Sequence, residues 1–290
     1  MAFEHTIRNA ILNRSKDRSV RMDTLLERKR LSVLRGRRKG KPDTGPLVVV
    51  FNSRASVQPE QAKMEFKYQV LRQTNRMLQV FDHDDSWYNL DQYYDRMIEV
   101  IQREMERTGV DSIITFGSSM GAYAAMSVAA DVPVSFALAM APRFSPNPDI
   151  VADNRREEHL RELSPAFVHD TAEAGLQKVK QAVILHGRYG NDRFHIRHFP
   201  RRPEIDHWII PTYDHLVAAF LKRDEMLTDV TDAALAQDRN AIAQILKQKN
   251  AIRATSLRYR AMMLPRRLKD YRRGYDTMIG RLPNGAPLTT

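Results

Sequence analysis

The chain is predicted to have an α/β fold with a mostly parallel sheet of six or more strands and helices on both faces. Three observations predict this fold. Short, wholly apolar runs such as 47–51 are typical of strands buried on both faces. Amphipathic segments such as 90–108, with Tyr93, Met97 and Ile101 on one side, are typical of helices that cover a sheet. The two kinds of segment alternate regularly between residues 47 and 223.

The elements follow in order along the chain. The first predicted strand is wholly apolar with three β-branched valines at its centre, the second ends at Asp82, and the fourth is closed by Ala141 and Pro142. The predicted strands are 47–51, 77–81, 112–116, 132–140, 181–186 and 206–211. The predicted helices are 60–73, 90–108, the Ala-rich segment 121–130, pieces of 149–174, and 216–223.

Segments of a different character flank this body. Residues 5–35 have sparse apolar positions among many charges and predict a helix, and the glycines and prolines of 36–46 predict a linker. No strand is predicted after Arg223, whereas 229–249 predicts a further helix. We therefore divide the chain into a basic helical extension over 1–41, an α/β domain over 42–226 and a basic helical C-terminal extension over 227–290.

Charge is unevenly distributed among these parts. Residues 1–41 carry 13 Lys/Arg against 4 Asp/Glu, and residues 247–290 carry 11 against 2, so each segment has a net charge of +9. Residues 42–246 have a net charge of −7. The basic ends fit three interpretations: binding to an anionic membrane surface, binding to a polyanion such as nucleic acid, or packing on the acidic body. No specific nucleic-acid motif accompanies the charge.

The remaining features of the sequence exclude several classes of protein and site. The chain has no cysteine, which excludes disulfides and Cys-based zinc sites. No apolar run approaches the roughly 18 residues of a membrane span, and residues 1–41 lack the apolar core of a secretory signal. We expect a cytoplasmic protein. No Walker-type or dinucleotide-binding glycine loop is present, so we expect no cofactor.

One motif lies between a predicted strand and the Ala-rich helix. Gly117-Ser118-Ser119-Met120-Gly121 places small residues two before and two after Ser119, as a strained strand-to-helix turn requires. Ser118 does not meet this demand, because Phe116 and Met120 are its neighbours at the same spacing. A glycine-rich turn without chemistry is the competing interpretation.

This segment resembles the nucleophile elbow of the α/β-hydrolase superfamily, in particular its serine esterase-like members. The resemblance implies a serine nucleophile at Ser119, followed along the chain by an acid and then a histidine. Asp192 follows the predicted strand 181–186, and His215 follows the last predicted strand, so both stand where the family has its acid and base. Asp206 and Asp214 are rival acids, and His207 is a weaker base candidate at the beginning of its strand.

The resemblance also implies an oxyanion hole. Its donors are expected to be the amides of Met120 and of Ser53, the latter in the Asn52-Ser53-Arg54 loop after the first predicted strand. That loop lacks the glycine-rich segment of lipases, which leaves the substrate class open. Arg54 fits either an anionic substrate group or an exposed surface position.

Other groupings have simpler interpretations. The run 82–85 is acidic with one histidine, but adjacent residues rarely converge on one ion, so we expect a loop or helix cap. His195 and His198 are three apart with no carboxylate spaced to complete a metal site. Trp87 and Tyr88 fit either the mouth of a pocket or burial against the neighbouring helix, and we expect Met120 and Met140 in the core.

The sequence therefore predicts a serine hydrolase that cleaves a small-molecule acyl ester, or an amide, through Ser119, His215 and Asp192. Two alternatives stay open. An acyltransferase would use the same three residues with a hydroxyl acceptor in place of water. A non-catalytic protein on a hydrolase scaffold would bind its partner through the basic ends.

Overall fold

The computed structural model describes residues 19–54, 63–153 and 157–259. Their backbone forms one nine-stranded sheet in the order β1-β2-β4-β3-β5-β6-β7-β8-β9. The six central strands run parallel, whereas β1, β2 and β9 pair with their neighbours in antiparallel fashion. The sheet is therefore mostly parallel, as predicted. The strands are β1 Val20–Glu27, β2 Leu31–Arg38, β3 Leu47–Phe51, β4 Met77–Asp82, β5 Ile113–Ser118, β6 Val134–Met140, β7 Ala182–Gly187, β8 Ile205–Ile210 and β9 Ile252–Arg253.

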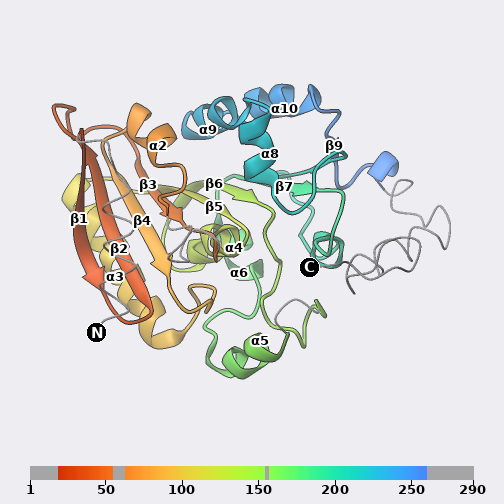
Figure 1. Ribbon diagram of the computed structural model, residues 1–290, viewed down its shortest axis with the longest axis horizontal. Coiled ribbons are helices and arrows are strands. Elements are labelled where there is room, and N and C mark those ends of the chain that lie inside the picture. Colours follow the sequence, from red (N-terminus) through yellow and green to blue (C-terminus); the bar gives the residue numbers. More distant parts are fainter. Residues whose placement is uncertain (1–18, 55–62, 154–156, 260–290) are drawn as a thin grey trace, which may run out of the picture.

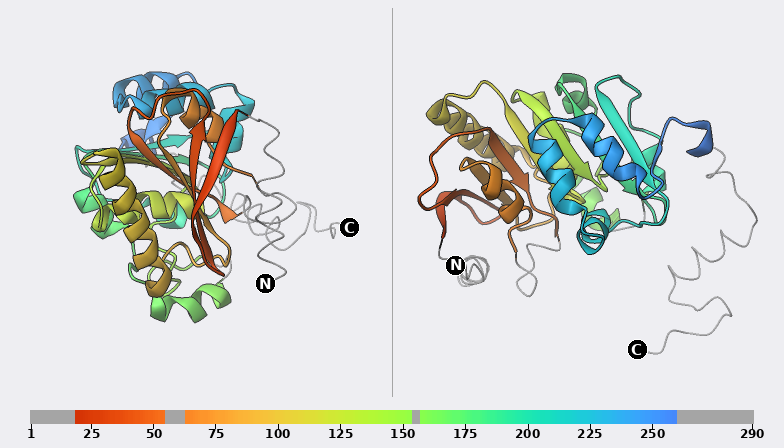
Figure 2. Two further views of the ribbon diagram at one scale, coloured as in Figure 1. Left: turned by 90° about the vertical axis from the view of Figure 1, so that its left-hand side faces the viewer. Right: turned by 90° about the horizontal axis from the view of Figure 1, so that it is seen from above.

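Helices cover both faces of this sheet (Figure 1 and Figure 2). Side chains of β3 alternate between two cores, since Val49 and Phe51 contribute to one and Val48 and Val50 to the other. The first core lies against α3, α4 and α6, and the second against α2, α8, α9 and α10. The helices are α2 Lys67–Gln73, α3 Asp91–Thr108, α4 Met120–Ser127, α5 Glu157–Leu163, α6 Glu173–Lys178, α7 Arg193–Ile196, α8 Val217–Arg223, α9 Leu227–Leu235 and α10 Arg239–Lys247, with short 3₁₀ turns at Val128–Ala130 and Ser164–Ala166.

The helix predicted for residues 5–35 is wrong where the structure describes this segment. Residues 20–38 form the antiparallel hairpin β1–β2, closed by reciprocal backbone bonds between Arg28 and Leu31 of 2.8 and 3.2 Å. β2 pairs with β4, and Leu31 and Val33 enter the first core. The sparse apolar positions that we assigned to a helix face thus belong to strands. The edge of β4, which supplies the partner, is distant in sequence.

Four basic residues of this hairpin pair with acidic residues, either of the body or of the hairpin itself. Arg35 binds Glu104 of α3 through two hydrogen bonds, Arg30 pairs with Asp84, and Arg21 and Arg37 both pair with Asp23. For these side chains, packing on acidic groups of the same chain is the interpretation that the contacts favour.

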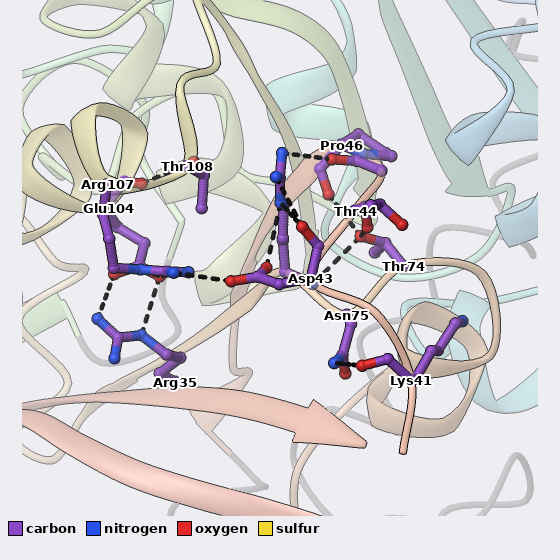
Figure 3. Close-up of polar contacts among 12 residues, drawn as sticks. Arg35, Lys41, Asp43, Thr44, Pro46, Thr74, Asn75, Glu104, Arg107 and Thr108 are labelled. Carbon is purple, nitrogen blue, oxygen red and sulfur yellow. Dashed lines mark hydrogen bonds and ion pairs between the residues drawn. The ribbon is translucent and has the colours of Figure 1, made fainter. Parts of the chain in front are cut away.

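Of residues 36–46, which we predicted to be a linker between domains, 36–38 belong to β2, and 39–46 are tied to the body by polar contacts (Figure 3). Asp43 pairs with Arg107 of α3 at 2.7 Å, and Asn75 donates to the Lys41 carbonyl at 2.8 Å. The Thr74 hydroxyl donates to the Pro46 carbonyl at 2.8 Å. The hairpin and the strands that follow are therefore continuous in one sheet.

The C-terminal part combines the predicted helices with an unexpected strand. The helix predicted over 229–249 is divided into α9 and α10, and Asp238 caps the second by accepting from the Ala241 amide at 2.9 Å. The prediction that strands stop after Arg223 is wrong, because β9 pairs with β8. Most of the two basic ends, residues 1–18 and 260–290, lies outside the described residues. No helix among the described residues is long and apolar enough to cross a membrane.

Candidate active site

Ser119 stands on a strained turn between β5 and α4. Its backbone has φ 54° and ψ −116°, a conformation that residues other than glycine rarely adopt. The turn is held in place by a hydrogen bond from the Ser119 amide to the Met140 carbonyl of 2.8 Å. Such strain persists only where the surrounding structure imposes it, and it clusters at functional sites.

The two glycines of the motif make this turn possible. A Cβ on Gly117 would lie 2.1 Å from the Gly121 carbonyl oxygen, and a Cβ on Gly121 would lie 2.1 Å from the Phe51 carbonyl oxygen. Both distances are far below a van der Waals contact. The requirement for small residues at these positions therefore comes from backbone atoms of the turn itself and of β3.

Ser119, His215 and Asp192 form one chain of hydrogen bonds. The Ser119 Oγ lies 2.8 Å from His215 Nε2, and His215 Nδ1 lies 2.9 and 3.0 Å from the two carboxylate oxygens of Asp192. A carboxylate only accepts, so Nδ1 carries the proton and Nε2 accepts from the serine hydroxyl. The three residues come from the ends of β5, β7 and β8, which meet at the carboxyl edge of the sheet.

Asp192 and His215 differ in how deeply their side chains are buried. The Asp192 side chain is 1% exposed, whereas that of His215 is 28% exposed. The two rival carboxylates lie elsewhere: Asp214 accepts from the Leu216 amide at 2.7 Å, and Asp206 pairs with Arg253. The position of Asp192 fits an orienting carboxylate, while the histidine keeps access to solvent.

Two buried histidines, His186 and His207, form a hydrogen-bonded pair. His186 donates through Nε2 to the Pro142 carbonyl at 2.8 Å, which leaves its Nδ1 to accept from His207 Nε2 at 2.9 Å. Burial lowers the pKa of His186 to about 4 and also lowers the pKa of His207. Both rings are therefore neutral near pH 7, and His207, our weaker base candidate, is occupied in this pair. No role was predicted for His186 from the sequence.

The two expected oxyanion donors differ in their surroundings. Met120 is the first residue of α4, so its amide has no intrahelical acceptor. Ser53, in contrast, donates through its amide to Glu65 Oε2 at 3.1 Å and through its hydroxyl to Glu65 Oε1 at 2.6 Å. Glu65 was not predicted to lie at the site, and no local pattern marks it, since the contact spans 12 residues. Arg54, next along the chain, pairs with Asp85 at 2.7 Å.

The acidic run after β4 forms a tight loop. The buried Asp82 carboxylate accepts from the Asp84 amide, the Ser86 hydroxyl and the Tyr88 amide at 2.9–3.0 Å. Trp87 and Tyr88 are both buried, as are Met120 and Met140. His195, in turn, bonds to Asp153 at 3.1 Å. Within the described part of the chain, no three His, Asp or Glu residues are grouped as metal ligands.

Comparison with known proteins gives information on the fold. No family model matches the chain, and no curated protein matches it. Among solved structures, Est1E from Butyrivibrio proteoclasticus is 14% identical with a TM-score of 0.53, covering 77% of this chain and 99% of its own. A bacterial heroin esterase is 12% identical with a TM-score of 0.52, and the match covers 82% of this chain and 90% of the esterase. Esterase B from Lactobacillus rhamnosis is 12% identical with a TM-score of 0.50, and the match covers 83% of this chain and 99% of the esterase.

At sequence identities of 12–14%, the similarity to these structures gives information on the fold alone. The likeness extends over 77–83% of this chain and 90–99% of each of those structures. The chain therefore has the α/β-hydrolase fold.

Proposed function

We propose that this protein is a serine hydrolase that cleaves a carboxylic ester, or an amide, through an acyl-enzyme. The observation that carries the proposal is the unbroken hydrogen-bond chain from Ser119, on its strained turn, through His215 to the buried Asp192. The names of three neighbours in structure, all esterases, favour ester over peptide substrates.

In the proposed mechanism each of the three residues has one role. Ser119 Oγ attacks the acyl carbon while His215 Nε2 takes the hydroxyl proton, and His215 then donates that proton to the leaving alcohol. Water, activated by the same nitrogen, attacks the acyl-enzyme and releases the acid. Asp192 holds the imidazole in the tautomer that has Nε2 free to accept, and it stabilises the imidazolium.

The oxyanion would be held by the amides of Met120 and Ser53. In the structure the Ser53 donors hold the Glu65 carboxylate, an anionic group of the kind that an oxyanion resembles. Glu65 must therefore give way when the tetrahedral intermediate forms. No cofactor takes part in any of these steps.

Covalent labelling with a fluorophosphonate probe tests the proposal. We expect the full chain to be labelled on Ser119 and Ser119→Ala to be unlabelled. Ser118→Ala removes the neighbouring hydroxyl and serves as the matched control, which should keep labelling. A panel of short- and long-chain p-nitrophenyl esters would then give the acyl preference. Absence of labelling in a folded protein, or labelling that persists in Ser119→Ala, would contradict the proposed mechanism.

A further inference from the structure

The peptide between Asn52 and Ser53 is held from both ends. Its N–H donates to Glu65, and its carbonyl accepts a hydrogen bond of 2.7 Å from the buried Tyr88 hydroxyl. The same hydroxyl has a second, longer contact of 3.2 Å with the Val80 carbonyl. The peptide lies directly against the nucleophile turn, since a Cβ on Gly121 would be 2.8 Å from the Asn52 carbonyl oxygen.

Tyr88 reaches this carbonyl from a strained loop. Asp85, Trp87 and Tyr88 have φ of 54°, 61° and 58°, and none of them is glycine. Such a backbone conformation is unfavourable for residues other than glycine. The Asp82 carboxylate compensates by binding the loop, including the Tyr88 amide at 2.9 Å. The Tyr88 ring also packs edge-on against Phe51 at 5.4 Å, which fixes its direction.

A hydrogen bond to a carbonyl affects the amide at the other end of the same peptide. The bond restrains the peptide plane, so the N–H keeps one direction. It also polarises the peptide, because linked hydrogen bonds strengthen one another in a poorly solvated interior. Both effects make the Ser53 N–H a better donor to an anion. Loss of the hydroxyl would remove them and leave the ring packing nearly unchanged.

We propose that Tyr88 is a positioning residue for the oxyanion hole, acting through the Asn52–Ser53 peptide on the Ser53 amide. The inference rests on the proposed function, in which that amide stabilises the oxyanion. Tyr88 itself touches neither the substrate nor the reacting atoms. Its contribution is made in the transition state, where the negative charge is concentrated on the oxygen.

The test compares Tyr88→Phe with Tyr94→Phe in the full chain. Tyr94 is equally buried, and its hydroxyl donates to Asp131 at 2.6 Å, away from the three candidate catalytic residues. Both variants lose one buried, hydrogen-bonded hydroxyl. We expect Tyr88→Phe to lower kcat about tenfold with KM nearly unchanged, less than the roughly 10²-fold cost of deleting an oxyanion donor. Inhibition by a boronic acid, which forms an anionic adduct with Ser119, should weaken in parallel.

A second pair of variants keeps the inference falsifiable if Tyr88→Phe does not fold. Replacement of Tyr88 by 3,5-difluorotyrosine keeps the ring and the hydroxyl but makes the hydroxyl a stronger donor, so kcat should rise and boronic acid binding should tighten. The same substitution at Tyr94 should change neither quantity.

The inference is overturned if Tyr88→Phe and Tyr94→Phe have the same kcat, if only KM changes, or if the fluorinated variants are indistinguishable. The proposed function fails separately, when the unmodified chain shows neither labelling nor ester cleavage. The two failures are therefore distinguishable.

Discussion

Substitution of Gly121 by alanine should remove most of the catalytic activity while the chain still folds. The added Cβ would lie 2.1 Å from the Phe51 carbonyl oxygen, about 0.9 Å inside the closest distance that such atoms adopt. Phe51 is the last residue of β3 and is paired with β4 on one side and β5 on the other, so it has little freedom to move. The first turn of α4, which carries the Met120 amide and follows Ser119, has to shift instead.

The size of the shift sets the expected effect. Overpacking of a close-packed interior costs about 1–3 kcal/mol of unfolding free energy. A displacement of about 1 Å at a catalytic group costs about 10²-fold in rate. We therefore expect Gly121→Ala to fold, to melt several degrees lower than the unmodified chain, and to lose about 10²-fold in kcat.

Gly175 provides a matched control. A Cβ there would lie 2.1 Å from the Met126 carbonyl oxygen, the same distance to the same kind of atom, but between α6 and the end of α4 remote from Ser119. Gly175→Ala should lose similar stability and keep its kcat. The assay is ester hydrolysis and fluorophosphonate labelling at a temperature where circular dichroism shows both variants folded. Equal kcat values in the two variants would refute the reasoning that Gly121 fixes the site.

Three further predictions follow from the site and its surroundings. Asp192→Asn should lower kcat by about 10⁴-fold, because an amide cannot hold the required tautomer, whereas Asp214→Asn should change ester turnover less than about threefold; similar effects in both would reassign the acid. Glu65→Gln replaces the charged acceptor on the Ser53 donors by a neutral one, so kcat/KM should rise about tenfold, since a hydrogen bond to a charged group exceeds a neutral one by about 1–1.5 kcal/mol; a fall in kcat/KM in the folded variant would argue against Ser53 as an oxyanion donor. Burial holds the pKa of His186 at about 4, below its value of about 6.5 in the unfolded chain. Between these values the unfolded state binds the additional proton, so stability falls as the pH drops from 6.5 towards 4, by up to about 1.4 kcal/mol per pH unit. Urea unfolding from pH 7 to pH 5 should show a smaller pH dependence in His186→Gln, and an unchanged dependence would contradict this assignment.

The sequence determined those features that depend on local pattern. Apolar runs bounded by turn residues placed six of the nine strands, since a strand buried on both faces has to be apolar throughout. Ser119 could be preferred over Ser118 as the predicted nucleophile, because a strained turn needs small residues two positions before and two positions after the serine. Only Ser119 has glycines at both of those positions. The resemblance to α/β-hydrolases, whose chain order is serine, acid and histidine, led us to expect Asp192 and His215 after two of the predicted strands.

Tertiary structure alone decided the features whose partners are distant in sequence. Residues 20–38 are strands because β4 offers an unpaired edge, and their own pattern of charges and scattered apolar residues does not reveal that edge. Glu65 reaches Ser53, and Tyr88 reaches the Asn52 carbonyl, only after the loops that follow β3 and β4 have closed beside each other. Side-chain to main-chain hydrogen bonds of this kind have no period and no required spacing. Local sequence therefore specified the chemical groups at the site, and the packing of the sheet selected their partners.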